Sequence, residues 1–137
     1  MVNEYRKILY GDDNEQNRSR VAQALRKRGY NVDSVNSPQE FVLRARSGDY
    51  NVVISDLDYS PEGAEGYGIM RQIMQIPTLK ILFTGRSGFE NIAEGIENGA
   101  DFVITSKSLD DLINLLEREL KGGERENGRW KITFSRG

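Results

Sequence analysis

One short stretch of the chain constrains its fold more than any other. Residues 51–57, NVVISDL, join a run of β-branched side chains to an acid, Asp56. A short, almost uncharged run of this kind is typical of a strand that is buried on both faces of a parallel sheet. Open parallel sheets hold their ligands in the crevice beyond the carboxyl ends of the strands. We therefore expect Asp56 to lie at a functional site.

Strand-like and helix-like segments alternate five times along the chain. The expected strands are Arg6–Tyr10, Asn31–Val35, the central stretch, Leu79–Phe83 and Phe102–Thr105. The expected helices are Asn17–Arg28 with Asn14 as N-cap, a helix opened by Ser37 and Pro38 and closed by Gly48, Tyr67–Gln75, Ser87–Asn98, and a helix that Ser108 caps and that ends near Leu120. This alternation predicts an α/β fold with a doubly wound, five-stranded parallel sheet.

The C-terminal segment has a different character, so we expect one domain over residues 1–121 and an extension over residues 122–137. GGERENGR, which opens the extension, is typical of a flexible linker. Trp130, Ile132 and Phe134 then alternate with polar residues, which predicts a strand that pairs with a sheet edge of its own chain or of a partner. We expect a monomer or a weak homodimer.

Composition excludes several classes of function. The 137 residues include no cysteine and no histidine, which rules out disulfides, thiolate metal sites, imidazole bases and histidine-ligated zinc. The net charge of −2 gives no reason to expect nucleic acid as a partner. No apolar run is long enough to span a membrane, and the first ten residues are too polar for a signal peptide. We expect a soluble, cytoplasmic protein.

Polar residues follow four of the expected strands. They are Asp12 and Asp13, Asp56, Thr84, and Lys107. Three carboxylates that lie close together repel one another and need a cation to stay ionised, and oxygen ligands suit Mg²⁺. A nearby hydroxyl and ammonium group could hold phosphoryl oxygens. The pattern predicts a Mg²⁺-dependent phosphoryl-transfer site with Asp56 as the nucleophile.

These residues also resemble a known family, the response-regulator receiver domains (CheY-like). The motifs that carry the resemblance are KILYGDD at residues 7–13, VVISDL at residues 52–57, ILFTG at residues 81–85 and GADFVITSK at residues 99–107. They occur in order, and each lies at the end of an expected strand. The resemblance covers residues 6–120 and implies a stand-alone receiver with the sheet order 2-1-3-4-5.

The resemblance implies a role in metal binding for four residues. Asp13 and Asp56 would bind Mg²⁺ directly, and Asp12 would act through a water molecule. The backbone carbonyl of Asp58 would complete the protein ligands.

The resemblance also implies how a signal enters and leaves. Asp56 would accept a phosphoryl group from a histidine kinase or a phosphotransfer protein, and Thr84 and Lys107 would contact the phosphoryl oxygens. The protein would not be an enzyme beyond its own phosphorylation and slow dephosphorylation. The fourth helix, the fifth strand and the last helix would form the face that meets a downstream protein, since the segment after Leu120 is too short for an output domain.

The sequence departs from the family pattern near the fifth strand and after Asp56. The loop after Asp56 is about two residues longer than usual, and Ser108 replaces a proline. Counting from the preceding Gly-Ala pair, Lys107 arrives one residue late, so Ser106 is an alternative occupant of the lysine position. The aromatic switch position of the family falls on one of three residues: Val103, Phe102 or Ile104.

Two other readings stay open. VVISDLDYS partly matches the first motif of haloacid-dehalogenase-type phosphatases, with Asp56 as nucleophile and Asp58 as general acid and base. Against it, Ser60 replaces the required Thr or Val, and no acidic strand end follows Lys107. A receiver-like scaffold that is never phosphorylated is the third reading. Asp58 and Arg86 flank the site; either they pair with each other or tune hydrolysis, or they are exposed loop charges.

Overall fold

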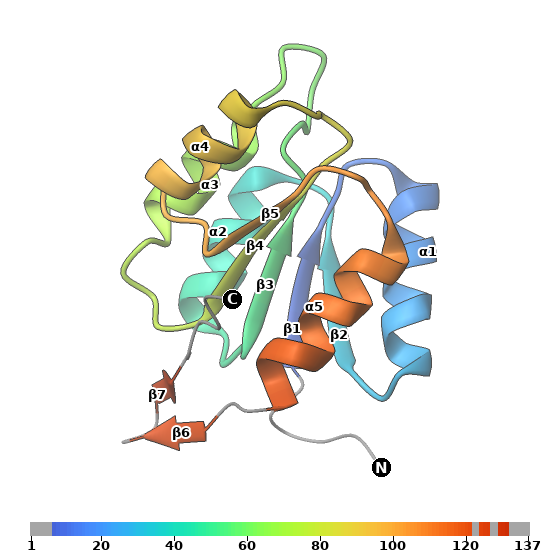
Figure 1. Ribbon diagram of the computed structural model, residues 1–137, viewed down its shortest axis with the longest axis vertical. Helices are drawn as coiled ribbons and strands as arrows, with labels where there is room; N and C mark the ends of the chain where they lie inside the picture. Colours follow the sequence, from blue (N-terminus) through green and yellow to red (C-terminus); the bar gives the residue numbers. More distant parts are fainter. Residues whose placement is uncertain (1–6, 122–123, 127–128, 132–137) are drawn as a thin grey trace.

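The structure is a computed structural model that describes residues 7–121, 124–126 and 129–131 (Figure 1). Its centre is a five-stranded parallel sheet in the order β2-β1-β3-β4-β5. The strands are β1 (Lys7–Gly11), β2 (Asn31–Val35), β3 (Val52–Ser55), β4 (Leu79–Phe83) and β5 (Phe102–Ile104). This order is the one that the resemblance implied, and the doubly wound α/β fold is confirmed.

Helices cover both faces of the sheet. They are α1 (Glu15–Lys27), α2 (Pro38–Ser47), α3 (Glu65–Gln72), α4 (Phe89–Glu97) and α5 (Leu109–Lys121). Residues of α1 and α5 share one core cluster with one face of the sheet, and residues of α2 and α3 share a second cluster with the other face (Figure 1). Because all strand pairs are parallel, the strand C-termini and the loops that follow them lie at one edge of the sheet.

The central strand β3 is buried along its whole length, as the sequence predicts. Its side chains alternate between the two core clusters. Val52 and Ile54 belong to the cluster with α1 and α5, whereas Val53 belongs to the cluster with α2 and α3. Burial on both faces fixes the register of β3 against its neighbours and thereby the position of Asp56 just beyond its end.

Three helix N-termini follow the predicted caps. The Asn14 side chain accepts a hydrogen bond from the Asn17 amide at 2.9 Å, and Ser37 accepts one from the Glu40 amide at 3.2 Å. Ser108 does the same for α5, with the Asp111 amide at 3.2 Å. Each cap satisfies a backbone N–H that the first helical turn leaves free.

Helix α3 begins and ends earlier than predicted, at Glu65–Gln72 instead of Tyr67–Gln75. The early start depends on the Glu65 carboxylate, which accepts a hydrogen bond from the Tyr59 amide at 3.0 Å and one from the Ser60 hydroxyl. The preceding residue, Ala64, is left-handed with φ of 69° and gives α3 no side-chain cap. Helix α3 is therefore tied directly to the loop that follows Asp56.

The extension contains two short strands where the sequence suggested one. Strand β6 (Glu124–Glu126) pairs antiparallel with β7 (Arg129–Lys131) in a separate two-stranded sheet. Strand β6 thus lies within the predicted linker, and β7 pairs with it instead of with β2 or β5. Ile132 and Phe134 lie outside the described residues.

None of the described helices has the length and apolar character that crossing a membrane requires.

Candidate functional site

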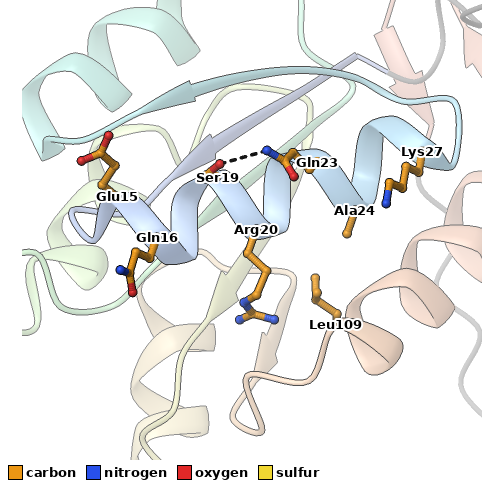
Figure 2. Close-up of a pocket in the computed structure, with 8 residues that line it drawn as sticks. All are labelled: Glu15, Gln16, Ser19, Arg20, Gln23, Ala24, Lys27 and Leu109. Carbon is orange, nitrogen blue, oxygen red and sulfur yellow. Dashed lines mark hydrogen bonds between the residues drawn. The ribbon is translucent and has the colours of Figure 1, made fainter.

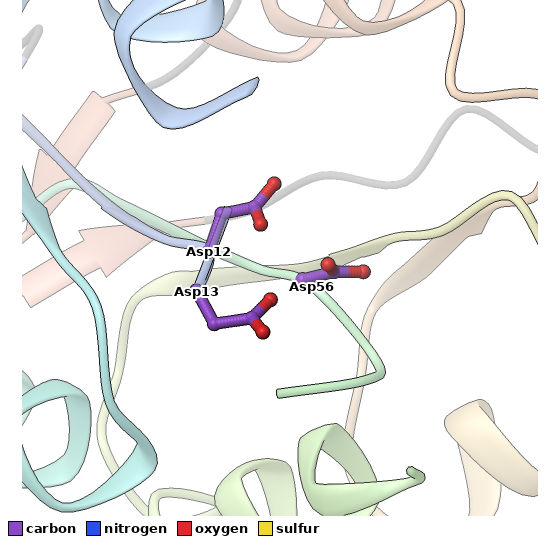
Figure 3. Close-up of side chains that lie close together, drawn as sticks. All are labelled: Asp12, Asp13 and Asp56. Carbon is purple, nitrogen blue, oxygen red and sulfur yellow. The ribbon is translucent and has the colours of Figure 1, made fainter. Parts of the chain in front are cut away.

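Three carboxylates converge beyond the ends of β1 and β3. Asp12 and Asp13 follow β1, Asp56 follows β3, and Figure 3 shows the three side chains close to one another. One carboxylate oxygen from each lies within 4.8 Å of the others. Asp12 is fully buried, Asp56 is 8% exposed and Asp13 is open to solvent. The cluster expected from the sequence is therefore present, with one acid at its surface and two beneath.

Asp12 is held by hydrogen-bond donors on both of its carboxylate oxygens. Its Oδ1 accepts from the Asn14 amide at 3.0 Å. Its Oδ2 accepts from the Tyr10 hydroxyl at 2.8 Å and from the Lys107 ammonium at 3.3 Å. A buried carboxylate keeps its charge only when such partners replace the water it has lost.

The structure places the Lys107 ammonium, and not the Ser106 hydroxyl, beside the acidic cluster. The Lys107 ammonium lies 3.3 Å from Asp12 Oδ2 and 3.5 Å from Asp56 Oδ1. Its backbone is left-handed, with φ of 54°. Ser106 is exposed, and its hydroxyl donates to Asp111 Oδ2 at 2.7 Å. Of the two residues that residue counting left open, the one whose side chain reaches the carboxylates is Lys107.

Burial shapes the electrostatics of Asp56. Removal from water raises the pKa of Asp56 to about 6, against the opposing effect of the Lys107 charge, and the Asp12 charge raises it further. Its Oδ1 accepts a hydrogen bond from the Leu57 amide at 2.8 Å. The negative charge of Asp56 is thus incompletely compensated, and added positive charge would favour its ionised form.

Thr84 lies just beyond the end of β4 and is almost completely buried. Its hydroxyl oxygen accepts a hydrogen bond from the Arg86 amide at 3.1 Å. Because β4 runs parallel to β3 as its neighbour, Thr84 ends at the same edge of the sheet as Asp56. The structure thus places the predicted hydroxyl at the site edge and connects it to the loop before α4.

Asp58 and Arg86 pair with each other, which was one of the two expectations for them. The Arg86 guanidinium binds both carboxylate oxygens, with Nε to Oδ2 at 3.0 Å and Nη2 to Oδ1 at 2.5 Å. Asp58 Oδ1 also accepts the Ala64 amide at 2.7 Å. Gly63 leaves room for the pair, because a Cβ there would lie 2.5 Å from both Arg86 Nη2 and Asp58 Oδ1. The pair joins the loop after β3 to the loop after β4.

On β5 the residue that faces α4 is aliphatic. Val103 packs with the α2 and α3 core cluster, and its methyl group lies beside Gly95 of α4. Phe102 and Ile104 pack against the opposite cluster. Of the three residues considered for the aromatic switch position, the one toward α4 is therefore Val103.

Sequence reasoning missed two tyrosines next to the acidic cluster. Tyr10 was read only as part of an apolar strand, yet its hydroxyl donates to Asp12. Burial, followed by the Asp12 charge, raises the pKa of Tyr10 and keeps its hydroxyl protonated. Tyr59 is also buried; its hydroxyl bonds to Ser55 at 2.7 Å and occupies the space that a side chain at Gly11 would need. A tyrosine in a strand two positions before a buried acid is a signal that could have been noticed, since both residues share one face.

A groove of about 660 Å³ runs beside the site, along α1 and the start of α5 (Figure 2). It is lined by Glu15, Gln16, Ser19, Arg20, Gln23, Ala24, Lys27 and Leu109. Its α1 wall begins two residues after Asp13, and Leu109 follows Lys107 by two residues. A large partner that reached Asp56 from this side would therefore contact the groove.

The sequence matches the family model described as the response regulator receiver domain over residues 8–117. It is 28% identical over 131 residues to the transcriptional regulatory protein HprR of Escherichia coli, covering 93% of this chain and 57% of that protein. The chain therefore spans little more than half the length of this curated relative, whose name is that of a regulator and not of an enzyme.

Solved structures show the same fold. A CheY-like receiver domain protein of Methanospirillum hungatei superposes with a TM-score of 0.74 at 23% identity, over 85% of this chain and 94% of that one. The chemotaxis response regulator CheY4 of Vibrio cholerae gives a TM-score of 0.69 at 24% identity, over 82% and 96% of the two chains. The family match extends over most of the described chain, from within β1 to within α5. The protein belongs to the response regulator receiver domain family.

Proposed function

We propose that this protein is the phosphoacceptor of a two-component phosphorelay, with Asp56 as the residue that is phosphorylated. The observation that carries the proposal is the position of Lys107, whose ammonium lies within 3.5 Å of carboxylate oxygens of both Asp12 and Asp56. A cation in that position can stabilise the negative charge of the phosphoryl group that Asp56 receives. The donor would be a histidine kinase or a phosphotransfer protein.

The donor set of the acidic cluster fits Mg²⁺. The ligand atoms that Asp12, Asp13 and Asp56 offer are carboxylate oxygens, which this hard cation prefers, and they lie within 4.8 Å of one another. Asp13 and Asp56 would hold the ion, Asp12 would act through water, and the Asp58 carbonyl would complete the set. When bound, Mg²⁺ would neutralise the crowded carboxylates and stabilise negative charge on the phosphoryl oxygens.

The remaining chemistry belongs to residues of the chain. A carboxylate oxygen of Asp56 forms a bond to phosphorus while the bond from phosphorus to the leaving nitrogen of phosphohistidine breaks. Lys107 and the Thr84 hydroxyl would bind the transferred phosphoryl oxygens. The Thr84 hydroxyl oxygen accepts from the Arg86 amide, which leaves its proton available to a phosphoryl oxygen.

A related structure offers a chemical parallel. A response regulator of Burkholderia pseudomallei, which superposes with a TM-score of 0.70 at 19% identity over 85% of this chain and 69% of that one, contains a phosphorylated aspartic acid and a calcium ion. That protein thus combines a modified aspartate and a divalent cation on the same fold. We carry this pairing over to Asp56 and its acidic neighbours as part of the proposal.

The phosphatase reading has less support than the phosphoacceptor reading. It requires Asp58 as a free general acid and base, but both oxygens of Asp58 bind Arg86. A scaffold that is never phosphorylated has no need of a positive charge beside Asp56. Lys107 nevertheless has a left-handed backbone and holds its ammonium in the acidic cluster. Both features favour a site that accepts a phosphoryl group.

We further propose that the signal leaves through α4, β5 and α5. Helix α4 exposes three large apolar side chains at helical spacing: Phe89 at 82%, Ile92 at 37% and Ile96 at 47%. An exposed apolar stripe of this kind is typical of a surface that binds another protein. The Asp58–Arg86 pair and the Thr84 hydroxyl both connect the phosphorylation site to the loop that leads into α4.

Incubation with acetyl phosphate tests the proposal. Intact-protein mass spectrometry should show one added phosphoryl group in the presence of Mg²⁺ and none with a chelator. Asp56→Asn should abolish the modification, and Asp13→Asn should raise the Mg²⁺ concentration that it requires.

Asp101→Asn is the matched control, because Asp101 is a partly buried carboxylate at the opposite end of the sheet, before β5. This variant should be modified like the parent. Undiminished modification of Asp56→Asn would overturn the assignment, and a parent that stays unmodified at all Mg²⁺ concentrations would favour the scaffold.

A further inference from the structure

Tyr10 makes a contact with the acidic site that the proposed phosphoacceptor function does not use. It lies on β1, its side chain is fully buried, and its ring belongs to the core cluster with α1 and α5. Asp12 lies two residues along the chain and shares the same side of the strand. The Tyr10 hydroxyl reaches up from the core to Asp12 Oδ2 at 2.8 Å.

The Tyr10 hydroxyl shares its acceptor with Lys107. Asp12 Oδ2 takes one hydrogen bond from each, whereas Asp12 Oδ1 is bound by the Asn14 amide. Among the described residues, Lys107 would be the remaining side-chain donor to Oδ2 if the tyrosine hydroxyl were removed. A fully buried carboxylate that loses one donor draws the next one closer, because an unmet buried charge is costly.

Lys107 also serves Asp56. Its ammonium lies 3.5 Å from Asp56 Oδ1, slightly farther than from Asp12 Oδ2. The nitrogen is therefore shared between two carboxylates that compete for it. How far it leans toward Asp56 depends on how well Asp12 is satisfied by other donors.

We infer that Tyr10 is a positioning residue for the phosphoacceptor site: by donating to Asp12 it fixes that carboxylate and leaves the Lys107 ammonium available to Asp56. The effect on Asp56 matters only if the proposed function holds, and in that respect the inference rests on the proposed function. The contacts of Tyr10 and Lys107 with Asp12 are present without metal and do not depend on it. Tyr10 touches neither Asp56 nor any group that would be transferred. It acts through Asp12 and Lys107.

The test compares two buried tyrosines by removing only a hydroxyl from each. Tyr10→Phe deletes the donor to Asp12, and Tyr59→Phe deletes a hydroxyl that bonds to Ser55 instead. The side-chain ammonium resonance of Lys107 is recorded by NMR in the metal-free proteins. It should shift in Tyr10→Phe, because the nitrogen moves toward Asp12, and should stay near its parent position in Tyr59→Phe.

Mg²⁺ affinity is then measured from backbone amide shifts of the same three proteins. Because Asp12 loses a neutral donor and the Lys107 ammonium moves away from Asp56, Tyr10→Phe should bind Mg²⁺ several-fold more tightly than the parent. Tyr59→Phe should stay within about twofold, since its hydroxyl bonds to an uncharged group. Equal affinities and an unmoved Lys107 resonance in Tyr10→Phe would reduce Tyr10 to a core residue and overturn the inference.

The hydroxyl proton of Tyr10 gives a measurement that does not depend on how Tyr10→Phe folds. It should resonate downfield as a hydrogen-bonded proton and move upfield in Asp12→Asn. Failure of the proposed function would look different, because a parent without Mg²⁺ binding could still show the Lys107 and Tyr10 signals. A Tyr10 hydroxyl proton that is unaffected by Asp12→Asn would overturn the inference.

Discussion

The guanidinium of Arg86 donates hydrogen bonds to both carboxylate oxygens of Asp58 and thereby connects the loop after β3 to the loop after β4. The same carboxylate accepts a hydrogen bond from the backbone amide of Ala64, the last residue before α3. Two segments that leave neighbouring strands on either side of the acidic cluster are thus joined by side chains at its rim. The pair is partly exposed, so its effect should be local ordering more than global stability.

Arg86→Gln should loosen the loop after β3 without unfolding the protein. The Ala64 amide should exchange its hydrogen faster, because Asp58 loses the partner that holds it in place. The free energy of unfolding should change by less than about 1 kcal/mol, as is usual for exposed ion pairs. Hydrogen exchange followed by NMR, together with urea denaturation, measures both quantities.

Arg44→Gln is the matched control for this prediction. Arg44 forms an exposed ion pair with Glu40 on α2, away from the acidic cluster. Its loss should leave the Ala64 amide unchanged. Equal exchange at Ala64 in the parent and in Arg86→Gln would show that the loop does not depend on the ion pair.

Lys107→Gln should slow phosphorylation of Asp56 by acetyl phosphate at least tenfold, because the variant keeps a long polar side chain but loses the charge beside both carboxylates. Ser106→Ala should be modified at nearly the parent rate, since the Ser106 hydroxyl bonds to Asp111 at the start of α5. Time courses by mass spectrometry at saturating Mg²⁺ distinguish the two positions. A severe defect in Ser106→Ala with normal modification of Lys107→Gln would reverse the assignment.

Asp56→Asn should stabilise the metal-free protein at neutral pH. Burial raises the folded-state pKa of Asp56 to about 6 from an ordinary value of 3.8, so the folded protein holds this proton to higher pH than the unfolded chain does. The free energy of unfolding of the parent therefore falls as the pH rises through that window. Asn removes this loss, and the gain at neutral pH should be on the order of 1 to 3 kcal/mol.

The gain should shrink as the pH falls from 6 toward 4. In this range the Asp56 carboxyl of the folded parent becomes protonated, so the buried charge that Asn removes is already neutralised. Thermal denaturation across this pH range in the presence of a chelator provides the measurement. Asp110→Asn removes an exposed carboxylate of α5 and should run parallel to the parent. Parallel curves for the parent and Asp56→Asn would contradict the prediction.

Gly95→Ala should destabilise the protein although alanine favours helices more than glycine does. Gly95 lies inside α4, where a Cβ would meet a methyl group of Val103 at 2.6 Å and Leu82 at 3.1 Å. The helix would have to move away from β5, at a cost of about 1 to 3 kcal/mol that is typical of overpacking. Urea denaturation gives the difference.

Gly68→Ala provides the opposite case on α3. A Cβ at Gly68 has no neighbour within 4 Å, so this variant should gain up to about 1 kcal/mol from helix propensity. If both substitutions stabilised the protein, close packing of α4 on β5 would not be the reason for Gly95.

Much of the fold could be predicted because its signals are local. The apolar run before Asp56 indicated a strand buried on both faces, and β3 is such a strand. Asn14, Ser37 and Ser108 marked helix starts because each side chain satisfies an amide within its own first turn. The convergence of Asp12, Asp13 and Asp56 followed from a rule about strand ends that needs no knowledge of side-chain packing.

What could not be predicted depends on contacts between distant or ambiguous residues. The role of Tyr10 was hidden because an aromatic residue in an apolar strand is usually a core residue, and only the structure shows its hydroxyl on Asp12. Strand β6 was hidden because its residues are charged and resemble a linker. The start of α3 was misplaced because it depends on Glu65 bonding back to the loop after Asp56.

The left-handed backbone of Lys107 has a consequence for how relatives of this protein are recognised. A gap-free comparison with the family would place Ser106 opposite the conserved basic residue, and the chain would be classed as a degenerate receiver that has lost its chemistry. In the structure the Lys107 backbone is left-handed, with φ of 54°, and its ammonium lies beside Asp12 and Asp56 although the residue comes one position later. Chains dismissed for lacking this lysine deserve a search one residue downstream.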